Sequence, residues 1–320
     1  MKRIVVTGTG TSIGKTHFSC ALARAAASQR LRVAAFKPVE TGIEPAGGDY
    51  TDSGQLAAVS SFHVKRWLDP VYTFREPISP HLAARRAGIS LELQPILDAI
   101  RLFDDLDLNL LLVELAGGLF SPLNSKESNA DLALALHTAS AAAITVPLTQ
   151  QIPVAADASG TAGALAATST PANPPPTAES PDSTTSGTWT ASPTPPESFP
   201  SASWSHADSF PPARDPSSPA FQDDSLPRIV VVAPDRIGVL HEIAATTRAA
   251  DAMNLPLAGI VLVMPERPDS STGLNGGEIP YVTSVPYLAS LRRAPIDALA
   301  TDLKISGFLA RLFSDLSPGA

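Results

Sequence analysis

Ten residues near the start of the chain have the composition of a loop that binds phosphate groups. The segment 7–16 reads Thr-Gly-Thr-Gly-Thr-Ser-Ile-Gly-Lys-Thr and lies between an apolar run and an apolar-periodic stretch. A strand, a loop and a helix in that order let backbone amides and the helix N-terminus surround phosphate oxygens. Lys15 would then contact the β- and γ-phosphates of a nucleotide, and the Thr16 hydroxyl would ligate Mg²⁺. The loop is a variant, because its first glycine is Gly8 and Thr9 follows, but its context disfavours the alternative of an incidental turn.

Charged residues also follow two further apolar runs. Lys37 ends the second run, with Asp52 after the next loop, and Glu114 ends the third. Ligands of doubly wound sheets collect beyond the carboxyl ends of the strands, so we expect Lys37 to face the same cavity as the phosphate loop. Mg²⁺ prefers oxygen ligands, which Thr16, Asp52 and Glu114 could supply together. Taken singly, each carboxylate could instead be a solvated loop residue or a helix cap, and the lysine a surface residue.

The elements that would position these residues alternate along the chain. Apolar runs separated by helical patterns predict a doubly wound, mostly parallel α/β sheet with helices on both faces. The expected strands are 3–7, 33–36, 110–113, 228–233, 257–263 and 281–285, and the expected helices are 15–27, 82–87, 91–102, 239–253 and 296–316. The run 143–146 could be one more strand.

Thirteen of the 31 prolines of the 320-residue chain are concentrated in the 71 residues 155–225. Residues 155–225 are dominated by Pro, Ser, Thr, Ala and Gly, and such a segment buries too little apolar surface to offset the entropy lost on ordering. We therefore expect a disordered insertion there. Residues 1–154 and 226–320 would together form one domain, since neither part has enough strands alone. The alternative is a linker between two independent domains.

The overall composition indicates a small-molecule role. The chain has 23 basic and 31 acidic residues and a net charge of −8, which disfavours nucleic acid or an anionic membrane as a partner. Its single cysteine, Cys20, excludes an intrachain disulfide. We find no secretory leader and no apolar run of spanning length, so we expect a cytoplasmic protein.

Several blocks of the sequence resemble dethiobiotin synthetase, a family with a P-loop NTPase-type fold. The resembling blocks are 7–9 with 14–16, 37–39 with 41–42, 72–74 with 76–77 and 79–81, and 114 with 116–118 and 121–123. The resemblance extends over residues 1–131, continues more weakly over 226–288, and leaves the Pro/Ser/Thr-rich segment outside it.

This resemblance implies an ATP- and Mg²⁺-dependent carbon–nitrogen cyclo-ligase of biotin biosynthesis. Such an enzyme forms the ureido ring of dethiobiotin from 7,8-diaminononanoate and CO₂. One amine takes up CO₂ as a carbamate, ATP phosphorylates it to a carbamic–phosphoric anhydride, and the second amine displaces phosphate. The resemblance also implies a homodimer.

The same resemblance assigns roles to individual residues. Lys37 and Lys15 would be catalytic, Thr41 and Thr11 would contact the substrate, and the magnesium ligands would be those proposed above. The residues expected to line ATP are Ser12, Ile13, Gly14, Lys15, Thr16, His17, Asp52, Glu114, Leu115, Ala116, Gly117, Pro286, Tyr287 and Leu288.

Some positions depart from the pattern of the family. Leu115 replaces a glycine and is expected to crowd the nucleotide, while His241 and Glu242 replace an Asn-His pair and Glu242 adds negative charge. Val263 and Met264 replace an Asn-Asp pair and cannot hydrogen-bond adenine. These departures motivate a different hypothesis, a degenerate or regulatory P-loop nucleotide-binding protein without ligase activity, such as a partitioning-type ATPase switch.

Overall fold

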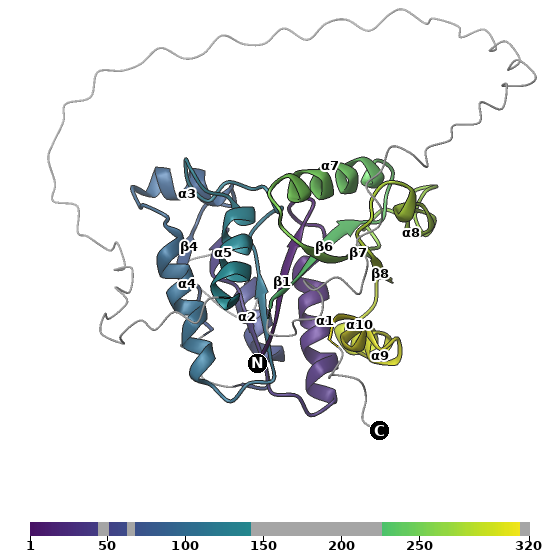
Figure 1. Ribbon diagram of the computed structural model, residues 1–320, viewed down its shortest axis with the longest axis horizontal. Helices are drawn as coiled ribbons and strands as arrows, with labels where there is room; N and C mark the ends of the chain where they lie inside the picture. Colours follow the sequence, from purple (N-terminus) through teal and green to yellow (C-terminus); the bar gives the residue numbers. More distant parts are fainter. Residues whose placement is uncertain (44–50, 63–67, 142–225, 314–320) are drawn as a thin grey trace, which may run out of the picture. The chain divides into compact units, whose positions relative to one another are not determined.

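The computed structural model describes residues 1–43, 51–62, 68–141 and 226–313 (Figure 1). The expected insertion at 155–225 and the possible strand at 143–146 lie outside these ranges, and both stay predictions.

A six-stranded parallel sheet forms the centre of the fold. Its strands are β1 (Lys2–Gly8), β2 (Val33–Phe36), β5 (Leu110–Glu114), β6 (Arg228–Pro234), β7 (Leu257–Val263) and β8 (Tyr287–Leu291). Their order is β2-β5-β1-β6-β7-β8, and every neighbouring pair is parallel. Strand β1 pairs with β5 on one side and with β6 on the other, so segments from both sides of the undescribed region 142–225 share one sheet.

Helices cover both faces of this sheet, which confirms the predicted fold class. One face carries α1 (Lys15–Ser28), α2 (Asp52–Val59), α9 (Ile296–Ile305) and α10 (Phe308–Leu312), and the other carries α3 (Pro80–Ala87), α4 (Leu93–Arg101), α5 (Asn129–Ala141) and α7 (Val239–Ala252). Successive side chains of β1 alternate between the faces: Ile4 and Val6 pack with α1, whereas Val5 packs in the opposite core. Within the described ranges, no helix combines the length and the apolar composition needed to cross a bilayer.

A second, two-stranded parallel sheet follows β2 closely. It pairs β3 (Val39–Thr41) with β4 (Tyr72–Phe74), and helix α3 begins six residues after β4. Strands of three residues are too short to give a periodic signal, so the sequence did not predict them. The pairing brings the chain around Thr41 next to the segment that leads into α3.

Two expectations for the C-terminal part are wrong. The strand expected at 281–285 is replaced by a short 3₁₀ helix, η4 (Ile279–Tyr281), and β8 begins only at Tyr287. Tyr281 is 73% exposed, whereas Leu288 and Leu291 of β8 are buried, so burial rather than β-propensity selects the strand. The single helix expected at 296–316 is broken into α9 and α10 at Gly307, which has a φ of 64°. The remaining elements are a 3₁₀ helix, η2 (Leu102–Asp105), and the short helix α8 (Asn275–Glu278).

We expect Gly259→Ala to destabilise the sheet between β7 and β8. A methyl group at this buried position would overlap the Leu288 side chain, and overpacking of this kind costs about 1–3 kcal/mol in free energy of unfolding. Urea denaturation followed by circular dichroism measures this cost. Gly277→Ala is the matched control, because nothing lies within 4 Å of its added methyl group, and its stability should be unchanged or raised by up to about 1 kcal/mol. Equal effects of the two substitutions would contradict the packing described for β8.

Candidate functional site

The phosphate loop connects β1 to α1 and depends on glycine at both of its ends. A Cβ atom at Gly8 would lie 2.9 Å from the carbonyl oxygen of Val232, so the loop leaves the sheet in close contact with β6. Gly14 is the N-cap of α1 with a φ of 92°, a conformation that L side chains rarely adopt. Since this N-cap has no side chain, no side-chain cap occupies the amides of the first turn of α1, and a helix N-terminus of this kind can bind an anion.

A cavity of about 440 Å³ lies beside this loop. Its lining contains twelve of the residues expected in the site, namely Thr11, Ser12, Ile13, Gly14, Lys15, Thr16, His17, Lys37, Thr41, Asp52, Ala116 and Gly117. It also contains residues that were not expected there, namely Pro77, Ile78, Ser79, Pro80 and Ser121. Lys15 and Lys37 therefore face the same cavity, from the phosphate loop and from the end of β2.

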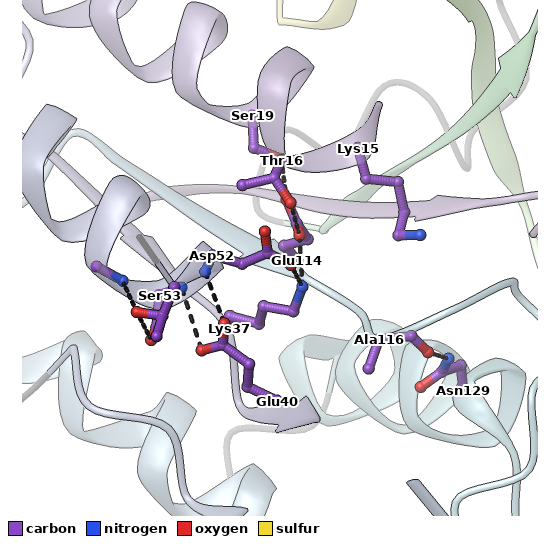
Figure 2. A network of polar contacts seen from close by, with 12 residues as sticks. Lys15, Thr16, Ser19, Lys37, Glu40, Asp52, Ser53, Glu114, Ala116 and Asn129 are labelled. Carbon is purple, nitrogen blue, oxygen red and sulfur yellow. Dashed lines mark hydrogen bonds and ion pairs between the residues drawn. The ribbon is translucent and has the colours of Figure 1, made fainter. Parts of the chain in front are cut away.

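A buried carboxylate at the end of β5 connects the elements around this cavity. Glu114 is 1% exposed, and its Oε1 accepts hydrogen bonds from Thr16 Oγ1 at 2.7 Å and from Lys37 Nζ at 3.0 Å. Its Oε2 accepts from Ser19 Oγ at 2.8 Å. Lys37 also forms an ion pair with Asp52, the first residue of α2 (Figure 2). A buried charge is tolerated only when it is paired and hydrogen-bonded, and Glu114 and Lys37 meet that condition for each other.

The two lysines of the cavity differ in their electrostatic surroundings. Burial alone would lower the pKa of Lys37, but the charges of Glu114 and Asp52 outweigh it, and the pKa is raised above its usual value. Burial lowers the pKa of Lys15 to about 8, with a smaller contribution from the positive charge of Lys37. Its Nζ donates to the carbonyl oxygen of Gly10 at 2.9 Å. The raised pKa favours the protonated form of Lys37, whereas the lowered pKa lets Lys15 lose its proton more readily.

The oxygen atoms around Lys37 are of the kind that hard cations prefer. The Thr16 hydroxyl and the carboxylates of Asp52 and Glu114 are hard donors, and all three lie in one hydrogen-bonded network with the Lys37 ammonium. Among the residues that the structure describes, no group of three or more His, Cys, Asp or Glu side chains could hold a metal. A cation here would therefore need the hydroxyl and phosphate oxygens in addition to the carboxylates.

Sequence reasoning missed two buried residues that support the site. Glu40 is 4% exposed and accepts hydrogen bonds from the first backbone amides of α2. Asn129, at the start of α5, donates from Nδ2 to the carbonyl oxygens of Ala116 at 2.6 Å and Gly118 at 2.9 Å, and so fixes the loop after β5. Glu40 lies between the resembling residues 37–39 and 41–42, and its side-chain contacts depend on the tertiary fold. Asn129 had no local signal at all.

The structure does not bring Pro286, Tyr287 and Leu288 to the cavity. They lie at the beginning of β8, and in a parallel sheet that end is opposite the one that carries the phosphate loop. Their assignment to the ATP site came from the family resemblance, and it stays a prediction. The turn that does follow β8 is near the loop, because His17 Nε2 hydrogen-bonds to the carbonyl oxygen of Ala294 at 2.9 Å.

Leu115 does not crowd the cavity as expected. Its side chain is 1% exposed and packs in the core, while its amide donates to Val6 at 2.9 Å, and it is not among the residues that line the cavity. Val263 packs against the phosphate loop: its Cγ1 is 2.8 Å from where a Gly14 Cβ would be. Val263 thus makes an apolar contact at a position where the family has a residue of its Asn-Asp pair.

The negative charge of Glu242 is compensated locally. Its Oε2 accepts from Thr9 Oγ1 at 2.9 Å, and its Oε1 accepts from the Arg236 guanidinium at 2.7 Å. The first turn of α7 is therefore hydrogen-bonded to the phosphate loop.

Comparisons with known proteins place similarity mainly in the N-terminal part. Residues 2–139 match the family described as an AAA domain. The chain is 39% identical over 138 residues to the ATP-dependent dethiobiotin synthetase BioD of Caulobacter vibrioides, a match that covers 42% of this chain and 63% of that relative. It is 41% identical over 139 residues to the protein of the same name from Nitrosospira multiformis, covering 43% of this chain and 60% of that one.

A more distant relative aligns over nearly the whole chain. The ATP-dependent dethiobiotin synthetase BioD of Rhodopirellula baltica is 24% identical over 293 residues, which covers 90% of this chain and 83% of the relative. The crystal structure of a ParA family ATPase from Chlorobium tepidum TLS aligns over 98% of both chains with a TM-score of 0.39 and 10% identity. The resemblance to dethiobiotin synthetases is confirmed, and the chain spans less than two thirds of the length of the Caulobacter and Nitrosospira relatives.

We expect the free energy of unfolding to depend on pH through Lys15. Its pKa in the folded protein is about 8 against a usual 10.5, so between these values the unfolded chain binds more protons and stability rises with pH. The difference in stability between the wild type and Lys15→Met should shift in favour of the wild type by about 1–3 kcal/mol from pH 7.5 to pH 10. Urea titrations at the two pH values measure this. A difference that does not change with pH would contradict the lowered pKa.

Proposed function

We propose that this chain is an ATP-dependent ligase of the dethiobiotin synthetase type, which closes a cyclic urea from 7,8-diaminononanoate and CO₂. The observation that carries the proposal is that two buried lysines, Lys15 and Lys37, line one cavity of about 440 Å³. The reaction handles two anions at once, a carbamate and a transferring phosphoryl group, and this cavity offers a cation for each. The identity of 39–41% over 138–139 residues to proteins named dethiobiotin synthetase supports the same conclusion.

The phosphate loop would bind the nucleotide. Amides of the loop and of the first turn of α1 would surround the phosphates, and Lys15 would exchange its bond to the Gly10 carbonyl for one to a phosphate oxygen. Mg²⁺, when bound, would neutralise part of the negative charge of the phosphates. Thr16, Asp52 and Glu114 would hold it, directly or through water.

Lys37 would act on the carbamate. In the first step an amine nitrogen bonds to the carbon of CO₂ and loses a proton, which leaves a carbamate anion. The ammonium of Lys37 is kept protonated by Glu114 and Asp52, so it is suited to bind and orient a carbamate oxygen. Thr11 and Thr41 line the same cavity and offer hydroxyls to the amines.

The remaining steps need positioning more than new chemical groups. A carbamate oxygen attacks the γ-phosphorus, and the bond from this phosphorus to the ADP oxygen breaks. The second amine then attacks the carbonyl carbon and releases one proton to solvent, the carbon–oxygen bond to phosphate breaks, and phosphate leaves as the ring closes. The fixed cations and the wall of the cavity keep the reacting atoms in line, and Pro77 to Pro80 form part of this wall.

The wider context belongs to the same proposal. By analogy with the family we expect a homodimer in the cytoplasm that acts on small molecules. The second candidate function is a nucleotide-dependent switch without ligase activity, favoured by Val263, whose apolar side chain stands where the family has a polar contact to adenine.

We expect purified protein to form dethiobiotin from diaminononanoate, bicarbonate and MgATP. Lys37→Met should lower the rate of dethiobiotin formation by about 100-fold or more, because a cation directed at a developing anion is removed. Mass spectrometry of the product and a coupled assay for ADP measure the two halves of the reaction. Lys304→Met, which removes an exposed lysine of α9, is the control and should keep the wild-type rate.

Two results would contradict the proposal. Release of ADP that is independent of the diamine, with no dethiobiotin formed, would favour the nucleotide switch. Wild-type rates in the Lys37→Met variant would remove Lys37 from the reaction.

A further inference from the structure

We propose that Glu40 is a positioning residue, which holds Asp52 in the orientation needed to bind the metal–nucleotide complex. The inference rests on the part of the proposed function that concerns nucleotide and Mg²⁺, and it is independent of the ligase reaction. Glu40 is a buried carboxylate that does not line the cavity, and its role is exerted through Asp52.

Glu40 connects two elements that meet at the cavity. It is the middle residue of β3 and is 4% exposed. Its Oε1 accepts from the backbone amide of Asp52 at 2.6 Å, and its Oε2 accepts from the amide of Ser53 at 3.2 Å (Figure 2). A carboxylate at a helix N-terminus is stabilised by unpaired amides and by the helix dipole. Glu40 therefore fixes the start of α2 against the small sheet.

The residue that Glu40 holds by its backbone is the one whose side chain reaches Lys37. Asp52 is the first residue of α2, its amide bonds to Glu40, and its carboxylate pairs with the Lys37 ammonium. Both the backbone amide and the side-chain carboxylate of Asp52 are thus held by contacts. Because Asp52 is bonded at its backbone, a loss of the Glu40 contact would move the carboxylate that faces the cavity.

Glu40 and Thr51 bind different amides of α2. The Thr51 hydroxyl is the N-cap and accepts from the Gly54 amide at 3.0 Å, whereas Glu40 accepts from the amides of Asp52 and Ser53. Of the two, only Glu40 holds the backbone of Asp52 itself. Glu40, Asp52 and Glu114 place three carboxylates near this end of the cavity, against the two ammonium groups of Lys15 and Lys37. An added dication would reverse that imbalance.

The test measures how much Mg²⁺ improves the binding of a non-hydrolysable ATP analogue. Isothermal titration of the full chain with excess Mg²⁺, and again with EDTA, gives the two dissociation constants whose ratio is the gain due to the metal. Supporting residues of metal ligands typically change metal affinity about 10- to 100-fold. We expect Glu40→Gln to reduce the gain about tenfold or more, with little change in the affinity measured in EDTA.

A double-mutant cycle shows whether Glu40 acts through Asp52. Asp52→Asn should reduce the gain by a similar factor, and adding Glu40→Gln to it should cause no further loss, because the two residues act in series. Thr51→Ala is the matched control: it removes a cap of the same helix, so it should lower thermal stability while the gain stays within about twofold of the wild type.

The outcomes separate this inference from the proposed function. Losses that multiply in the double variant, or an unchanged gain in Glu40→Gln, would overturn the role of Glu40. If Glu40→Gln does not fold, Glu40→Asp replaces it; its shorter carboxylate should give a loss in the same direction, and a wild-type gain would overturn the inference. Mg²⁺-dependent binding without dethiobiotin formation would refute the ligase and leave Glu40 standing, whereas no effect of Mg²⁺ on the wild type would overturn the inference itself.

Discussion

The buried Glu114 carboxylate is the interaction on which the rest of the site depends. It receives hydrogen bonds from α1 through Thr16 and Ser19, and from the end of β2 through Lys37. The ion pair with Lys37 is stable only because both charges have further partners, so the removal of any one member leaves a buried charge uncompensated. The contacts that the buried charge of Glu114 needs thus hold the phosphate loop and β2 next to each other. The ion pair between Lys37 and Asp52 adds helix α2 to the same site.

The order of the strands explains why residues from distant parts of the chain meet there. Strand β1 lies between β5 and β6, and all neighbours are parallel, so the segments that follow Gly8, Glu114 and Pro234 leave the sheet at one edge. The phosphate loop contacts two of these segments directly: a Cβ at Gly118 would lie 3.2 Å from the carbonyl oxygen of Gly8, and Thr9 bonds to Glu242 beyond β6. Such a loop needs partners from both halves of the described chain.

The sequence predicted the parts of the site that are encoded locally. Lys37 and Glu114 follow apolar runs directly, Lys15 ends the glycine-rich loop after the first run, and their placement follows from the parallel sheet. Glu40 and Asn129 could not be found this way, because their role depends on backbone groups far along the chain or across a loop. The expectation for Leu115 failed because the chain still follows the sheet there: its amide bonds to Val6, which turns its side chain into the core. Pro286 to Leu288 lie at the start of edge strand β8, outside the lining of this cavity, and their assignment to the ATP site rested on the family resemblance alone.

Two departures from the expected pattern compensate each other. A threonine at position 9, where the strict loop has glycine, adds a hydroxyl that needs a partner, and Glu242 supplies the acceptor. Glu242 would be unfavourable beside a phosphate site if it were free, but Arg236 shares its charge and its place in the first turn of α7 is favoured by the helix dipole. The hydrogen bond between Thr9 and Glu242 therefore fixes the loop to α7, whereas a glycine at position 9 would leave the backbone there more flexible. Because each residue accounts for the other, neither departure argues by itself against phosphate binding.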